Sequence, residues 1–76
     1  MPKSVFSAKY TRFRAMLVEA RKKARMTQAE LAVRLGRKQS YVSKFERGER
    51  RLDIVEFLEI AEVLAIDVLG FVERLL

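Results

Sequence analysis

The chain has 76 residues and neither cysteine nor histidine, so it is long enough for one small domain and lacks the usual ligands of zinc sites. The same absences remove the commonest nucleophile and general base, and no stretch is apolar enough to span a membrane. We therefore expect a cytoplasmic protein that is not an enzyme and uses no metal or cofactor. Residues 1–52 carry 15 basic and 4 acidic side chains, whereas residues 53–76 carry 1 and 6, which favours polyanion binding by the first part.

The first predicted helix covers about residues 8–24, where apolar side chains recur at three- and four-residue steps. The residues that form this stripe are Tyr10, Phe13, Leu17, Ala20 and Ala24. Residues 1–7 have no such pattern, and we expect them to be flexible.

The next two predicted helices are short and close together. The second begins at a capping box, in which Thr27 and Glu30 can each satisfy a backbone N–H group of the other. Gly36 can adopt the left-handed conformation that closes a helix, so this helix ends just before it. The third runs over about residues 39–47 and ends at Gly48. A short turn containing glycine between two short helices is typical of a helix-turn-helix.

Two further helices are predicted in the acidic last part of the chain. Asp53 and Glu56 form a second capping box, which starts the fourth helix, and the fifth begins after Asp67. The pattern contains no linker or repeat. The sequence therefore predicts an all-α fold, with residues 1–76 forming one compact domain of five helices.

The segment TQAELAVRLGRKQSYVSKFERGERR, at residues 27–51, resembles the helix-turn-helix of the Xre/Cro family of lambda-repressor-like domains. The resemblance covers about residues 8–70 and includes the later segment IAEVLAI. It implies a prokaryotic or phage-encoded transcriptional regulator that binds double-stranded DNA. The third helix, residues 39–47, would be the recognition helix in the major groove.

The resemblance also implies roles for single residues. Base edges would be read by four side chains of the third helix: Gln39, Ser40, Ser43 and Lys44. Phosphates would be bound by one amide and by four cations around that helix: Gln28, Arg37, Lys38, Arg50 and Arg51. Gln28 would also support Gln39, while Arg21 and Glu46 would form a structural ion pair. Lys38 occupies the N-cap position, where a cation opposes the helix dipole unless a phosphate neutralises it.

A single short recognition helix reads only about half of an operator, so we expect a homodimer on a palindromic site. Its interface would use three apolar residues of the fifth helix: Leu69, Val72 and Leu76. One alternative is an antitoxin that autoregulates through the same domain and covers its apolar C-terminal surface with a toxin. Another is a protein-interaction module that does not bind DNA, although the basic first part argues against it.

Overall fold

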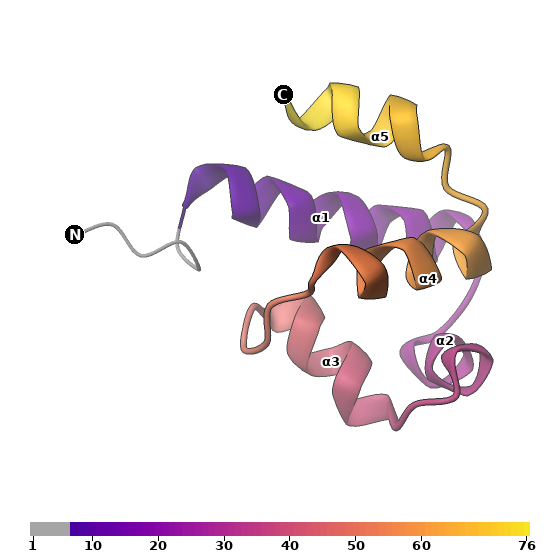
Figure 1. Ribbon diagram of the computed structural model, residues 1–76. Coiled ribbons are helices and arrows are strands. Elements are labelled where there is room, and N and C mark those ends of the chain that lie inside the picture. The colour runs from indigo at the N-terminus through magenta and orange to yellow at the C-terminus, as the bar shows by residue number, and fades with distance from the viewer. Residues whose placement is uncertain (1–6) are drawn as a thin grey trace.

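The computed structural model describes residues 7–76, and this part of the chain contains five helices and no strands. The helices are α1 (Ala8–Lys23), α2 (Gln28–Leu35), α3 (Gln39–Arg47), α4 (Ile54–Leu64) and α5 (Val68–Leu75) (Figure 1). The predicted all-α, five-helix fold is confirmed. No helix in this range is long and apolar enough to cross a membrane.

The N-cap residue of α1 is Ser7, which is the last residue of the segment that we expected to be flexible. Its hydroxyl accepts a hydrogen bond from the backbone N–H of Tyr10 at 3.0 Å and so caps α1. The rest of that segment, residues 1–6, lies outside the described residues.

Both predicted capping boxes are formed. In α2, Thr27 and Glu30 exchange two side-chain to backbone hydrogen bonds of 2.8 and 3.0 Å. In α4, Asp53 and Glu56 do the same, also at 2.8 and 3.0 Å. Each box satisfies two of the N–H groups that a helix leaves without an internal partner, so both predicted helix starts are confirmed.

A residue with a positive φ angle lies at or just beyond the end of each of the first four helices, but only two of these residues are glycine. Gly36 and Gly48 close α2 and α3 with φ angles of 70° and 84°, as predicted. Arg25 follows α1 with a φ of 61°, and Ala65 follows α4 with a φ of 55°. The latter two are strained because a Cβ atom disfavours this conformation.

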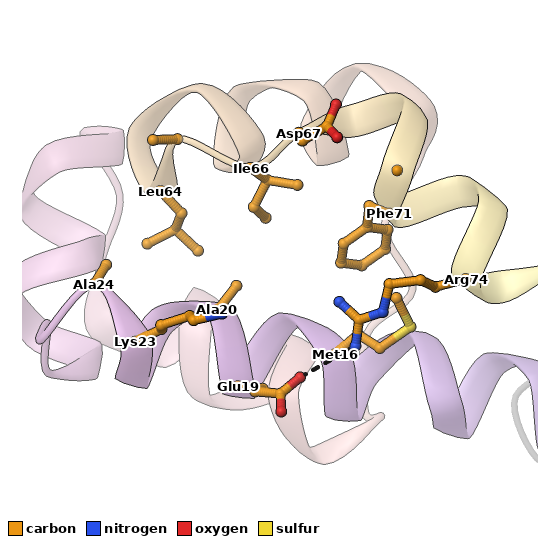
Figure 2. A pocket seen from close by; sticks show the side chains of 12 residues that line it. Met16, Glu19, Ala20, Lys23, Ala24, Leu64, Ile66, Asp67, Phe71 and Arg74 are labelled. Carbon is orange, nitrogen blue, oxygen red and sulfur yellow. Dashed lines mark hydrogen bonds and ion pairs between the residues drawn. The ribbon is translucent and has the colours of Figure 1, made fainter.

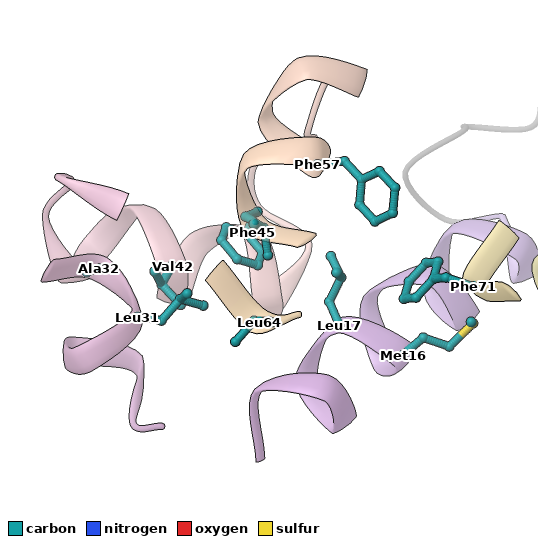
Figure 3. Close-up of a cluster of buried hydrophobic side chains, with 10 residues drawn as sticks. Met16, Leu17, Leu31, Ala32, Val42, Phe45, Phe57, Leu64 and Phe71 are labelled. Carbon is teal, nitrogen blue, oxygen red and sulfur yellow. The ribbon is translucent and has the colours of Figure 1, made fainter. Parts of the chain in front are cut away.

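The core joins all five helices (Figure 3). Its least exposed large side chains come from α1 to α4 and are Leu17, Leu31, Val42, Phe45 and Ile60. Phe71 attaches α5 through aromatic contacts, with its ring centroid 5.1 Å from that of Phe57 and 5.9 Å from that of Phe13. Met16, which lies outside the predicted α1 stripe, is also buried and faces this aromatic group.

The fifth helix is held to α1 by an arginine that contacts its last turn. The guanidinium of Arg12 donates two hydrogen bonds, of 2.8 and 3.1 Å, to the carbonyl of Arg74 near the end of α5. A groove of about 370 Å³ separates the two helices (Figure 2). Its floor is apolar, and its rim carries both charge signs, including an exposed 3.4 Å pair between Arg74 and Glu19.

Candidate nucleic-acid interface

The third helix has one buried face and one exposed face. Val42 and Phe45 are 0% and 1% exposed, and they pack in the core behind the helix. Three of the four predicted base-reading side chains are exposed on its other side: Gln39, Ser40 and Lys44. The fourth, Ser43, is half-buried, and its hydroxyl donates to the carbonyl of Ser40 at 3.3 Å. The structure thus gathers polar side chains at the first half of α3.

The last residues of α3 are fixed to α1 by two arginines. Arg21 and Glu46 form a two-pronged ion pair with N–O distances of 2.7 and 3.1 Å, and their side chains are only 12% and 6% exposed. Arg21 also donates to the carbonyl of Met26 at 2.9 Å, before α2. Arg14 donates to the backbone carbonyl of Glu46 at 2.9 Å, where a cation also suits the negative end of the helix dipole.

The glycine after α3 leaves room for the Arg14 guanidinium. A Cβ atom built on Gly48 would lie 2.9 Å from the Arg14 Cζ atom, closer than such atoms normally approach. The helix-turn-helix pattern did not identify Arg14 as part of the site. Its only signal was a basic residue seven positions before Arg21, which many exposed helices also contain.

The structure does not support the expected contact between Gln28 and Gln39. The Gln28 amide instead donates to the Glu46 carboxylate at 2.8 Å, and no hydrogen bond between the two glutamines occurs in residues 7–76. A carboxylate is a stronger acceptor than an amide oxygen, and the side chain of Glu46 is nearly buried. Gln28 therefore helps to hold the buried ion pair in the free protein.

The turn before α3 carries two exposed cations. Lys38 is the N-cap residue, and its side chain makes no capping hydrogen bond. The Arg37 guanidinium lies over the ring of Tyr41, with its Cζ atom 4.4 Å from the ring centroid. One of its terminal nitrogens is 3.9 Å from a carboxylate oxygen of Glu59. Positive charge therefore collects at the end of α3 where the helix dipole is also positive.

The two arginines after α3 have partners within the protein. Arg50 forms a two-pronged ion pair with Glu56 at 2.8 and 3.0 Å. This hydrogen bonding, together with the backbone N–H of Asp53, lowers the pKa of Glu56 from its ordinary 4.5 to about 2. Arg51 stacks on the ring of Tyr10 at 4.1 Å and is otherwise exposed. Of these two arginines, only Arg51 is free of a carboxylate partner in residues 7–76.

The comparisons with known proteins agree with this geometry. A helix-turn-helix family model matches residues 17–71. A solved structure described as an XRE-family like protein from Pseudomonas syringae pv. tomato str. DC3000 is 46% identical, with a TM-score of 0.85. That similarity covers 90% of this chain and 83% of the other. The chain belongs to the Xre family of helix-turn-helix proteins. No curated protein matches the chain.

Proteins of the Xre family are regulatory DNA-binding proteins, and the match includes the whole of α2, α3 and α4. The exposed side of α3, with the cations of the turn before it, is thus the candidate interface of this Xre-family protein. In Figure 1 helices α2 and α3 lie at the bottom of the molecule, whereas α5 lies at the top.

Proposed function

We propose that this Xre-family protein is a sequence-specific regulator that binds double-stranded DNA with α3 in the major groove. The observation that carries the proposal is the contrast between the two sides of α3. Gln39, Ser40 and Lys44 are exposed, while Val42 and Phe45 behind them are fully buried. A rigid helix with exposed polar residues near its start is what base reading requires.

The chemistry of these side chains suits base edges. An amide such as that of Gln39 can bond N6 and N7 of adenine together, and the Lys44 ammonium can reach O6 and N7 of guanine. Lys38 and Arg37, which lie exposed in the turn before α3, would bind the phosphates that flank the groove. The backbone N–H groups of the first turn and the helix dipole add to this attraction.

The test is a selection from a pool of random-sequence duplexes at two salt concentrations. We expect an enriched palindromic site, loss of base preference in Gln39→Ala, and uniformly weaker binding with a shallower salt dependence in Lys38→Ala. If no sequence is enriched and binding vanishes at physiological salt, the proposed function is wrong.

The regulator would act as a homodimer that places two α3 helices about 34 Å apart along the DNA. In support, Leu69 and Val72 of α5 and Leu76 just after it are 79%, 39% and 88% exposed. Val72 also lines an apolar groove of about 420 Å³, together with Ile54 of α4. A second copy of the chain would remove this apolar surface from water.

Sedimentation equilibrium tests the dimer. We expect Val72→Asp to dissociate it, because the new charge would be buried in the interface without a partner. Val33→Asp is the matched control, since Val33 is equally apolar and 78% exposed but lies on α2. A wild-type protein that binds its DNA site only as a monomer would contradict this part of the proposal.

A further inference from the structure

Two arginines from opposite ends of α3 meet on one aromatic ring. The Tyr41 ring has the Arg37 Cζ atom 4.4 Å from its centroid and the Arg50 Cζ atom at 4.9 Å. Both distances are within the range of a cation–π interaction. The ring also packs edge-on against Phe45, with centroids 5.5 Å apart and an interplanar angle of 75°. Since Phe45 is buried, Tyr41 is attached to the core.

Arg50 is bound on its other side to α4. Both of its terminal nitrogens donate to Glu56, at 3.0 and 2.8 Å, and one of them also donates to the carbonyl of Arg51 at 3.1 Å. Glu56 is itself fixed, because it accepts the backbone N–H of Asp53 at 3.0 Å in the capping box. Arg50 therefore has few donors left for an external acceptor, and it holds the Tyr41 ring in place.

Arg37 differs from Arg50 in what else it contacts. Its guanidinium makes no hydrogen bond within the described part of the chain, and the nearest carboxylate is the Glu59 oxygen at 3.9 Å. Both side chains of this pair are exposed, by 39% and 55%, so solvent screens their attraction. Arg37 is thus oriented by the ring and still has donors for another acceptor.

We propose that Tyr41 is a positioning residue, whose ring holds the Arg37 guanidinium beside the first turn of α3 for contact with a DNA phosphate. Arg50 and Glu56 keep the ring in place and do not themselves contact the DNA. This inference rests on the proposed function. In this proposal Tyr41 does not contact a sugar or base directly, as an aromatic residue at this position of a recognition helix could. Arg37 and Arg50 also have different roles.

The experiment measures the dissociation constant for a short mixed-sequence duplex over a series of KCl concentrations. The variants are Arg37→Ala, Tyr41→Leu, their combination, and Arg50→Ala, each checked by circular dichroism for folding. Tyr41→Phe is the conservative control, because it keeps the ring. In the free protein, the NMR chemical shift of the Arg37 δ-protons shows whether the guanidinium stacks on the ring, because the ring current should move it upfield.

We expect Arg37→Ala to reduce the magnitude of the logarithmic salt slope by about 0.9, as for one lost phosphate contact. Tyr41→Leu should weaken binding by about threefold, in line with one exposed cation–π contact, and should add nothing in the Arg37→Ala background. Tyr41→Phe should bind like wild type. Arg50→Ala should lower the melting temperature. It should leave the salt slope unchanged, because Arg50 does not contact the DNA.

Three results would overturn the inference while leaving the proposed function intact: additive effects of Tyr41→Leu and Arg37→Ala, a Tyr41→Leu protein that binds like wild type, or no upfield shift of the Arg37 protons. A different result separates the two proposals. If the wild-type protein binds no duplex at any salt concentration, the proposed function fails, and the phosphate role of Arg37 fails with it.

Discussion

The two ends of α3 are held in different ways. At its last turn, Glu46 accepts hydrogen bonds from Arg14, Arg21 and Gln28, and the helix ends in a glycine that fits against one of these arginines. At its first turn, the N-cap residue Lys38 makes no side-chain hydrogen bond.

This difference separates stability from recognition. The last turn uses one buried ion pair, between Arg21 and Glu46, together with a hydrogen bond from Arg14, and these contacts fix the direction of the helix. The first turn leaves the Lys38 cation and the polar side chains of Gln39 and Ser40 exposed, as a surface that binds an anionic ligand requires. Changes at the last turn should therefore alter the free energy of unfolding, whereas changes at the first turn should alter binding.

The largest effect is expected from Glu46→Ala. This change leaves the guanidinium of Arg21 without its carboxylate in a site that is only 12% exposed, so the free energy of unfolding should fall by about 3 kcal/mol. Urea denaturation measures this value. Glu49→Ala is the matched control, because its pair with Arg47 has a similar distance of 2.9 Å but is exposed. Equal losses in the two variants would contradict the distinction between buried and exposed pairs.

A comparison of the two helix-closing glycines should give the next largest effect. Gly36→Ala and Gly48→Ala both place a Cβ atom in a left-handed conformation, which costs about 1 kcal/mol. At Gly36 the new atom meets nothing within 4 Å, whereas at Gly48 it meets the Arg14 guanidinium. We expect the total loss at Gly48 to be about 2 kcal/mol, because Arg14 must also leave the α3 carbonyl. Thermal denaturation of the two variants would show equal shifts if this contact contributes nothing.

The ion pair between Arg50 and Glu56 predicts a dependence of stability on pH. Because the folded-state pKa of Glu56 is about 2 and the ordinary value is 4.5, its contribution is present above pH 4.5 and is lost as the pH falls towards 2. After allowance for screening of the 40% exposed Arg50, we expect about 1–2 kcal/mol. Denaturation at several pH values should show this loss in wild type and in Glu59→Gln, and a smaller loss in Glu56→Gln.

The smallest effect concerns Lys38 and has opposite signs for stability and binding. Lys38→Ser supplies the missing N-cap hydrogen bond and removes a cation from the positive end of the dipole, so the free protein should gain about 1 kcal/mol. The same change should weaken DNA binding, because a phosphate contact is lost. Lys38→Gln removes the charge without adding a good cap and should show a smaller gain in stability. A loss of stability in Lys38→Ser would contradict the view that α3 lacks a stabilising N-cap in the free protein.

Most of the fold could be predicted from local signals. Capping boxes such as the one formed by Thr27 and Glu30, and the glycines that close α2 and α3, depend only on neighbouring residues. The ends of α1 and α4 could not be identified in this way, since Arg25 and Ala65 have side chains that disfavour the left-handed conformation they adopt. There the packing of the following residues outweighs the local preference.

The residues of the candidate site could be predicted from the sequence, but most of the contacts between them could not. The resemblance to the Xre/Cro family implied which residues of α3 are exposed and that Arg21 pairs with Glu46. It did not show that Gln28 contacts Glu46, that Arg14 reaches the end of α3, or that Arg50 is bound to Glu56. Each of these contacts joins residues from different elements, so it depends on how the helices pack and not on sequence spacing.

The most direct test of the contrast within α3 is amide hydrogen exchange, measured by NMR on the free protein and on its complex with the selected duplex. We predict that the last turn, at Phe45 and Glu46, is already protected in the free protein. Protection at Gln39 and Ser40 should rise strongly on binding. The opposite result, with no change at the first turn and new protection confined to α5, would show that α3 does not contact the DNA.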